Sequence, residues 1–480
     1  MAVGAHLDGP IGHTDLAAIM KAYDVRGVVP DQWGTTEARA LGAASARVLA
    51  GPGDTFVIGH DMRPSSAGLV DAFASGVLDA AVDVVVIGLC STDGLYYASG
   101  AEQAPGAMFT ASHNPAQYNG IKLCRSGAKP VGQDTGLPEV RELAQRYLAE
   151  GVPSAGSRGS RTDRDLLPAY AAYLRELVPL EGGRHLTVVV DAGNGMGGLT
   201  VPAVLEEGAG LAPLPLRVVP MYFELDGTFP NHEANPLEPE NLRDLQAAVV
   251  EHGADIGIAF DGDADRCFVV DERGEPVSPS AITALVALRE VAKEDAAGRH
   301  ATIIHNLITS RVVPEMVSAA GATPRRTRVG HSFIKQEMAD SGAVFGGEHS
   351  AHYYFRDFWG ADTGMLAAMH VLAALAEHDG PLSDLVARFE KYPASGEINS
   401  TVDDVAAAVA RVRSEFVSRG AGFDELDGMT VASAGGTMWW FNLRASNTEP
   451  LLRLNVEAAD ARTMEAVRDE VLALVRQEAS

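Results

Sequence analysis

The chain has 480 residues, of which 46% are hydrophobic, and this length exceeds what a single hydrophobic core supports, so we expect several domains. Its formal net charge of −26 argues against non-specific binding to nucleic acid, because such binding needs basic side chains to neutralise phosphates. The three cysteines are widely spaced, which argues against a disulfide framework and a zinc site and fits a reducing cytoplasm. The N-terminal residues do not resemble a signal peptide, and no apolar stretch is long enough to span a membrane. These features favour a soluble cytoplasmic protein.

Apolar runs typical of buried strands alternate with amphipathic segments typical of helices up to about residue 390. The helices are expected at 38–50, 241–252 and 282–296, with another that begins near Pro138. The strands are expected at residues 56–61, 83–88, 186–191, 255–260 and 301–305. This alternation predicts α/β units with mixed, mainly parallel sheets.

The last part of the chain has a different pattern. A helix is expected from about Asp403, and a closing helix after Asp460, which is a suitable N-cap. Between them, strands are expected at 429–432, 438–443 and 451–456. The sequence therefore predicts a smaller C-terminal α+β domain.

Turn-forming or Gly/Ser/Pro-rich stretches at 151–160, 271–274 and 391–396 divide the chain. Four domains are expected from these divisions. Their predicted bounds are 1–160, 161–272, 273–390 and 391–480.

Residues 110–122 read Thr-Ala-Ser-His-Asn-Pro-Ala-Gln-Tyr-Asn-Gly-Ile-Lys and place Ser112 just before an Asn-Pro turn signal. We expect an exposed hydroxyl that can carry a phosphoryl group, with His113 and Lys122 stabilising its charge. The alternative is a serine turn without chemistry, which would be the better interpretation of an isolated Ser-His pair.

Asp261, Asp263 and Asp265 alternate with Gly and Ala in the segment Asp-Gly-Asp-Ala-Asp-Arg. Short carboxylates suit Mg²⁺, and a cation offsets their mutual repulsion. The alternatives are a solvated acidic loop and a calcium-binding EF-hand. Arg266 stands where an EF-hand needs Gly, and strand-like residues follow it, so we favour Mg²⁺.

Two further segments offer ligand-binding groups. Residues 444–448, Arg-Ala-Ser-Asn-Thr, combine a guanidinium with hydroxyls and an amide, which suits a phosphate. Residues 346–355, Gly-Gly-Glu-His-Ser-Ala-His-Tyr-Tyr-Phe, combine a carboxylate and a hydroxyl that suit sugar hydroxyls. Metal binding by His349 and His352 is disfavoured, because no third ligand is near in the sequence.

Along the chain, the serine segment comes first, followed by the aspartate segment, residues 346–355 and residues 444–448. With its segments in this order, the chain resembles the α-D-phosphohexomutase superfamily, and within it the bacterial phosphomannomutase/phosphoglucomutase group. Residues 21–27 and 329–335 also look like segments of this family. The resemblance implies three related α/β domains and a smaller fourth one around a central cleft. It implies interconversion of a hexose 1-phosphate and a hexose 6-phosphate, of mannose or glucose, by way of a phosphoserine and a 1,6-bisphosphate.

The resemblance also implies roles for individual residues. The catalytic group comprises Ser112, Lys122, Arg26, His113 and His331. The substrate-binding group comprises Tyr23, Glu348, Ser350, His352, Arg444, Ser446, Asn447 and Thr448. Ser112 and the three aspartates, Asp261, Asp263 and Asp265, would bind Mg²⁺, a hexose 1,6-bisphosphate would be the activator, and the protein would be a monomer or dimer.

Two departures and several alternatives accompany this interpretation. Ile308 takes the place of a lysine found in some dual-specificity members, and residues 90–93 lack the usual Thr-Pro-rich turn. A phosphoglucosamine mutase is an alternative, against which the Glu348, Ser350 and His352 combination counts. A Mg²⁺-dependent phosphohydrolase or a non-catalytic sugar-phosphate binder is a weaker alternative, because no water nucleophile is identified and a binder has no need of Ser112.

Overall fold

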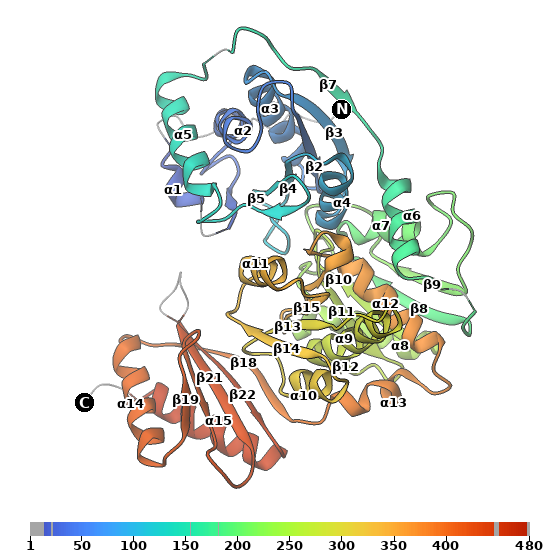
Figure 1. Ribbon diagram of the computed structural model, residues 1–480, viewed down its shortest axis with the longest axis vertical. Coiled ribbons are helices and arrows are strands. Elements are labelled where there is room, and N and C mark those ends of the chain that lie inside the picture. Colours follow the sequence, from blue (N-terminus) through green and yellow to red (C-terminus); the bar gives the residue numbers. More distant parts are fainter. Residues whose placement is uncertain (1–13, 21–22, 154, 181, 446–450, 478–480) are drawn as a thin grey trace. The chain divides into compact units, whose positions relative to one another are not determined.

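The computed structural model describes residues 14–20, 23–153, 155–180, 182–445 and 451–477 (Figure 1). It divides into two compact units. The first comprises Met1–Val277, Met338–Phe345 and Ser350–Leu385, and the second comprises Ser278–Glu337, Gly346–His349 and Val386–Ser480. No helix in the described ranges has both the length and the apolar character needed to cross a bilayer.

The first unit begins with a seven-stranded mixed sheet in the order β1-β5-β4-β2-β3-β7, with β6 beside β5. β2 pairs in parallel with β3 and β4, and β3 with β7, whereas β5 pairs antiparallel with β1, β4 and β6. The strands are β1 (Val25–Val28), β2 (Thr55–His60), β3 (Asp83–Leu89), β4 (Gly106–Phe109), β5 (Tyr118–Arg125), β6 (Lys129–Pro130) and β7 (Arg161–Asp163).

Side chains of this sheet alternate between two cores, as expected of strands covered on both faces. Phe56 and Ile58 of β2 belong to the core shared with α2, α3 and α5, whereas Val57 belongs to the core shared with α4. Helices therefore cover both faces of the sheet (Figure 1). The helices of this part are α1 (Leu16–Ile19), α2 (Thr35–Leu49), α3 (Ser66–Asp79), α4 (Thr92–Glu102) and α5 (Leu137–Glu150).

A second sheet of the first unit has the order β12-β11-β10-β8-β9. β8 pairs in parallel with β9 and β10, and β11 runs antiparallel to β10. Val188, Val189 and Val190 of β8 are all buried, which explains why this strand is a continuous apolar run rather than an alternating one. The strands are β8 (Leu186–Asp191), β9 (Leu216–Met221), β10 (Ile256–Phe260), β11 (Cys267–Asp271) and β12 (Pro276–Val277).

Other elements complete the first unit. They are α6 (Leu167–Leu177), α7 (Gly197–Leu205), η1 (Pro239–Leu242), α8 (Arg243–His252), the antiparallel pair β16 (Tyr353–Phe355) and β17 (Ala361–Asp362), η2 (Arg356–Phe358) and α12 (Gly364–Ala376). The division between the units falls within α11 (His331–Ser341), β15 (Phe345–Gly347) and α13 (Leu382–Val386).

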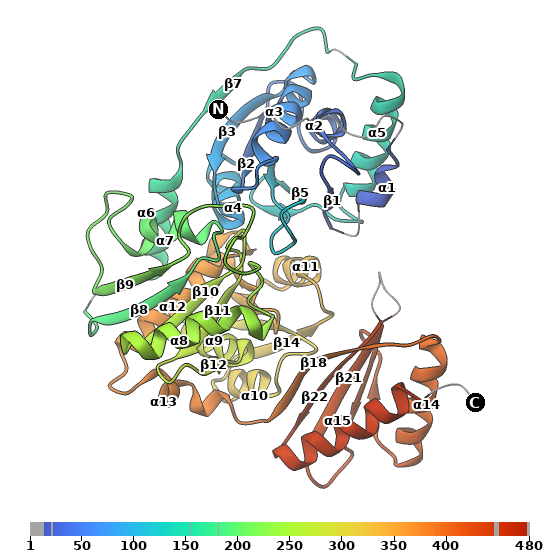
Figure 2. The same cartoon turned by 180° about the vertical axis from the view of Figure 1, so that it is seen from behind.

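The second unit contains the parallel pair β13 (Thr302–Asn306) and β14 (Thr323–Thr327), with α9 (Pro279–Ala296), α10 (Val312–Ala319) and η3 (Ala387–Phe389). Its C-terminal part is an antiparallel sheet in the order β18-β22-β21-β20-β19. Helices α14 (Val405–Ser418) and α15 (Ala461–Val475) share one core with this sheet (Figure 2). The strands are β18 (Ala394–Thr401), β19 (Gly422–Asp424), β20 (Met429–Ala432), β21 (Trp439–Ala445) and β22 (Leu451–Ala458).

The structure confirms each expected strand and helix, with shifts of a few residues at their ends. Asp460 caps α15 as predicted, since its Oδ1 accepts from the backbone N–H of Thr463 at 2.9 Å. α2 begins earlier than predicted because the Glu37 carboxylate accepts from the backbone N–H of Gly34 at 2.8 Å. In the C-terminal sheet the sequence missed β18 and β19, which have few buried side chains.

The carboxylate of Asp93, near the start of α4, joins three segments of the first unit. It is buried and accepts hydrogen bonds from the hydroxyls of Ser91, of Tyr170 on α6 (2.7 Å) and of Thr363, the N-cap of α12 (2.6 Å). Burial raises the pKa of Asp93 to about 6, although the three hydroxyls favour the ionised form.

This raised pKa predicts how the stability contribution of Asp93 varies with pH. The folded protein binds a proton at Asp93 below about pH 6, whereas the unfolded chain binds it only near the ordinary value of 3.8. Ionised Asp93 therefore costs stability above pH 6, on the order of 3 kcal/mol, and this cost disappears as the pH falls toward 4. The melting temperature of the wild type, relative to that of Asp93→Asn, should rise over this range. Parallel curves would contradict the shift.

Candidate active site

Ser112 lies in the loop between β4 and β5, and it is 5% exposed rather than exposed as expected from the sequence. Its backbone has φ +50°, in the left-handed region that few non-glycine residues adopt. The backbone N–H of Ser112 donates to Thr110 Oγ1 at 2.8 Å, which helps to hold this conformation.

The guanidinium of Arg63 binds the backbone of the loop that carries Ser112, here called the serine loop. It donates to the carbonyl oxygens of Ser112 (2.8 Å) and Asn114 (2.6 Å) through Nη2, and to two further carbonyls of the loop through Nη1. Asp61 fixes Arg63 through a buried ion pair of 3.1 Å. Arg63 is the main structural residue of the site that the sequence did not reveal, because its partners are backbone atoms about fifty positions away.

Asp261, Asp263 and Asp265 occupy the connection between the antiparallel strands β10 and β11. All three side chains are buried, so the solvated-loop alternative is wrong. The flanking strands also exclude the EF-hand alternative, which requires helices. One carboxylate oxygen from each of the three lies within 4.8 Å of the others.

This loop fits a divalent cation on its own atoms. Oδ1 of Asp263 and Oδ1 of Asp265 are buried and accept no hydrogen bond from any described residue. Buried carboxylate oxygens without donors are costly unless they bind a cation. Three short carboxylates also form the all-oxygen ligand set that Mg²⁺ prefers.

The serine loop and the aspartate loop touch. Ser112 Oγ donates to Asp261 Oδ2 at 2.8 Å. Gly262 permits this approach, because a Cβ at this position would lie only 2.4 Å from the carbonyl oxygen of Ser112. The hydroxyl that would carry a phosphoryl group therefore lies directly beside the predicted metal ligands.

Two cations balance the buried carboxylates. Lys122 Nζ contacts Oδ2 of Asp263 at 2.7 Å and Oδ2 of Asp265 at 2.5 Å, and Arg266 Nε donates to Asp261 Oδ2 at 2.9 Å. Burial opposes ionisation of Asp263 and Asp265, yet the attraction of Lys122 lowers the pKa of both carboxyls below the ordinary value. Burial raises the pKa of Asp261 to about 6, against the attraction of Arg266.

The charge states of Lys122 and His113 follow from the same neighbours. Burial opposes the charge on Lys122, but Asp263 and Asp265 raise its pKa well above the ordinary value. Burial and the nearby Arg266 lower the pKa of His113 to about 3, so its ring is neutral. Arg266 Nη2 donates to His113 Nδ1 at 2.8 Å, which leaves the ring proton on Nε2.

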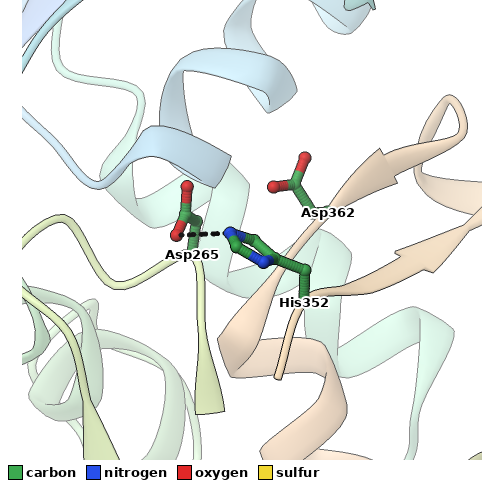
Figure 3. A group of neighbouring side chains, drawn as sticks. All are labelled: Asp265, His352 and Asp362. Carbon is green, nitrogen blue, oxygen red and sulfur yellow. Dashed lines mark ion pairs between the residues drawn. The ribbon is translucent and has the colours of Figure 1, made fainter. Parts of the chain in front are cut away.

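A second group of possible ligands adjoins the first and shares Asp265 with it. It consists of Asp265, His352 and Asp362, whose ligand atoms also lie within 4.8 Å of one another. Figure 3 shows the imidazole of His352 directed toward Asp265, with 3.6 Å between Nε2 and Oδ1. The expectation that no third ligand lies near is wrong for His352, because β17 brings Asp362 to it, whereas His349 is not part of this group. His349 instead contacts Ser280, at 3.3 Å.

The structure places most of the other predicted residues. Arg26 on β1 donates to Asn114 Oδ1 of the serine loop at 2.6 Å and to Asp24 at 2.7 Å. Tyr23, just before β1, is half-buried. Ser350 lies beside His352, with 3.1 Å between its Oγ and the imidazole Nδ1.

In the second unit, Glu348 is buried and accepts from Asn306 Nδ2 at 3.2 Å and from the backbone N–H of Gly330 at 3.3 Å. Arg444 lies near the end of β21, between two carboxylates, those of Asp427 at 3.6 Å and Glu397 at 3.7 Å. Three predicted phosphate ligands, Ser446, Asn447 and Thr448, lie outside the described residues, as does the side chain of His331.

In comparisons with known protein families, four family models match four consecutive parts of the chain. They are described as phosphoglucomutase/phosphomannomutase alpha/beta/alpha domain I (residues 17–149), domain II (168–274) and domain III (278–392), and the C-terminal domain (397–474). Three α/β domains and a smaller C-terminal α+β domain therefore make up the fold, as predicted.

Relatives are similar over nearly the whole chain. A protein of Xanthomonas campestris described as phosphohexose mutases is 43% identical over 95% of this chain and 98% of its own length. A phosphomannomutase of Salmonella typhimurium is 41% identical over the same shares. A solved structure of a phosphoglucomutase/phosphomannomutase family protein from Burkholderia thailandensis has a TM-score of 0.83 and 28% identity, and the match covers 96% of this chain and 98% of that one.

The four matches occur in chain order, and the serine and aspartate loops fall in the first and second of them. From these matches and this site geometry, the chain belongs to the phosphoglucomutase/phosphomannomutase family and is a mutase, an intramolecular phosphotransferase.

Proposed function

We propose that the protein interconverts hexose 1-phosphate and hexose 6-phosphate, with mannose or glucose as the sugar, and that Ser112 carries the phosphoryl group. The observation that carries this proposal is the 2.8 Å hydrogen bond from Ser112 Oγ to Asp261, within a buried loop that holds two more carboxylates. A serine without transfer chemistry has no need of such neighbours, because burying charged groups is costly.

The proposed reaction has two phosphoryl transfers. Phosphoserine 112 gives its phosphoryl group to the free hydroxyl of the sugar phosphate, so that the serine O–P bond breaks and a sugar O–P bond forms. The hexose 1,6-bisphosphate then returns its other phosphoryl group to Ser112, which regenerates phosphoserine and releases the isomeric monophosphate. The same bisphosphate, taken from solution, would activate a protein whose Ser112 is not phosphorylated.

Asp261, Asp263, Asp265 and a phosphoserine oxygen at Ser112 would hold Mg²⁺, which when bound offsets negative charge on the transferring phosphoryl group. Lys122 and Arg26 would stabilise the same charge, since Lys122 is held as a cation beside the loop and Arg26 contacts Asn114. His113 is neutral and accepts from Arg266, so it would orient Arg266 rather than supply positive charge.

Glu348 and Ser350 would bind hydroxyls of the sugar, and His352 and Tyr23 would complete that part of the site. Arg444, with Ser446, Asn447 and Thr448, would bind the phosphate that is not reacting, and His331 would act near the reacting hydroxyl. We propose the domain division 1–160, 161–272, 273–390 and 391–480, and a cytoplasmic monomer or dimer.

An assay of the purified protein with several sugar phosphates tests the substrate. Mannose 1-phosphate and glucose 1-phosphate, each with a trace of the matching 1,6-bisphosphate, should be converted to the 6-phosphate, and glucosamine 6-phosphate should be a much poorer substrate. Release of inorganic phosphate without isomerisation would instead identify a phosphohydrolase. Turnover of glucosamine 6-phosphate alone would identify the other mutase branch.

Replacing Ser112 with Ala removes the atom that carries the phosphoryl group, so activity should fall by roughly 10³-fold or more. Intact-protein mass after incubation with hexose 1,6-bisphosphate should show one phosphate on the wild type and none on Ser112→Ala. Ser45→Ala is a matched control, because Ser45 is also buried but lies on α2. An active and unphosphorylated Ser112→Ala would refute the proposed carrier.

Asp263→Asn should weaken Mg²⁺ binding and lower kcat, because a neutral amide is a poorer ligand for a hard cation. Calorimetry measures the first effect and Mg²⁺ titration of the activity measures the second. Asp71→Asn is the control, since that carboxylate is exposed and pairs with Arg161. Full activity in metal-free buffer with EDTA would exclude a metal role for the loop.

A further inference from the structure

Thr92 makes two hydrogen bonds to one residue of the aspartate loop. Its Oγ1 donates to Asp263 Oδ2 at 2.6 Å, and its backbone N–H donates to the carbonyl oxygen of Asp263 at 3.0 Å. Thr92 is fully buried and is the first residue of α4. The first N–H groups of a helix have no intrahelical acceptor, and the carbonyl oxygen of Asp263 supplies an acceptor for the N–H of Thr92.

The hydroxyl bond fixes how the Asp263 carboxylate is turned, and the backbone bond fixes the position of the residue that carries it. Oδ2 receives the Thr92 hydroxyl and the Lys122 ammonium, while Oδ1 is buried and accepts no hydrogen bond from the described residues. A partial rotation of the carboxylate would break the Thr92 bond, whereas a half-turn would give the same arrangement again, because the two oxygens are equivalent. The orientation observed therefore leaves Oδ1 for a cation.

Of the two donors to Oδ2, Thr92 is the more rigid. Lys122 has a long flexible side chain that is 19% exposed, and the proposed reaction requires its charge at the phosphoryl group. Thr92 has a β-branched side chain with restricted χ1, and its backbone is bonded to the same loop. In the proposed reaction Asp263 would therefore keep the Thr92 bond when Lys122 moves to the phosphoryl group.

Thr92 is itself held on both sides. Ser91 caps α4 by accepting from the backbone N–H of Gly94 at 3.2 Å. Asp93 binds Tyr170 at 2.7 Å and Thr363 at 2.6 Å. The turn that carries Thr92 is thus anchored to α6 and to the start of α12. Because Thr92 is held in place, it can hold Asp263 of the aspartate loop in place.

We propose that Thr92 is a positioning residue of the metal site, which holds Asp263 in the orientation that binds the divalent cation. This inference rests on the proposed function only in that the aspartate loop binds Mg²⁺. Removing a hydrogen-bond partner of a metal ligand typically weakens metal affinity by 10- to 100-fold.

Thr92→Val and Thr92→Ser form the decisive pair. Valine keeps the shape, the β-branch and the backbone N–H but removes the hydroxyl, whereas serine keeps the hydroxyl. Calorimetric titration of the full-length protein with Mg²⁺ should give an affinity about 10-fold weaker for Thr92→Val, and an affinity near the wild type for Thr92→Ser. At saturating Mg²⁺, kcat of Thr92→Val should return toward the wild-type value.

A double-mutant cycle with Asp263→Asn separates this role from general packing. When Asp263 is already replaced, Thr92→Val should change Mg²⁺ affinity little further. If the melting temperature shows that Thr92→Val is not folded, Thr92→Ala takes its place and is compared with Thr92→Ser in the same way.

Three outcomes overturn the inference, and they differ in what else they affect. Wild-type affinity in the folded hydroxyl-free variant overturns it and leaves the proposed function intact. Equal weakening in Thr92→Ser overturns it also, because the loss of affinity then does not depend on the hydroxyl. A wild type that binds no Mg²⁺ overturns it together with the metal part of the proposed function.

Discussion

The repulsion among three carboxylates buried in one short loop is the constraint on which the candidate site depends. At a separation of 4 Å and an effective dielectric constant of 20, each pair of such charges repels by about 4 kcal/mol. Lys122 offsets part of this repulsion through its ion pairs with Asp263 and Asp265, and Arg266 through its ion pair with Asp261. A divalent cation would offset the remainder, and in the proposed function it would do so beside the phosphoryl group on Ser112.

The same constraint accounts for the surroundings of the loop. Hydrogen-bond donors converge on the carboxylates from parts of the chain far apart in sequence: Ser112 and Lys122 in or beside the serine loop, and Thr92 on α4. Gly262 carries no side chain, so the backbone of the serine loop can approach closely. The two loops therefore fold as one structure, although about 150 residues separate them.

Much of this site could be predicted because its main motifs are local. The residues of the serine loop and of the aspartate loop are each consecutive, so their composition alone indicates phosphate and metal chemistry. Arg63, Thr92 and Asp362 could not be found in this way, since each acts on a partner that only the fold brings near. The burial of Ser112 was missed for the same reason: its cover comes from the other loop.

The fold shows a similar division. Strands with continuous apolar runs, such as β8 and β10, were predicted because both of their faces are buried. β18 reads Ala-Ser-Gly-Glu-Ile-Asn-Ser-Thr and buries little, so its sequence resembles a loop. It becomes a strand only because β22 offers it a partner at the edge of the C-terminal sheet.

The grip of Arg63 on the carbonyl oxygens of the serine loop has a consequence for the energetics of a carrier residue. In the proposed cycle Ser112 alternates between a neutral hydroxyl and a phosphate that bears about two negative charges. A loose loop would relax around each form, and that relaxation would add a reorganisation energy to both transfers. Because Arg63 and Asp61 hold the backbone of the loop, its dipoles would stay oriented in both states of the proposed cycle, and this contribution to the barrier would be small.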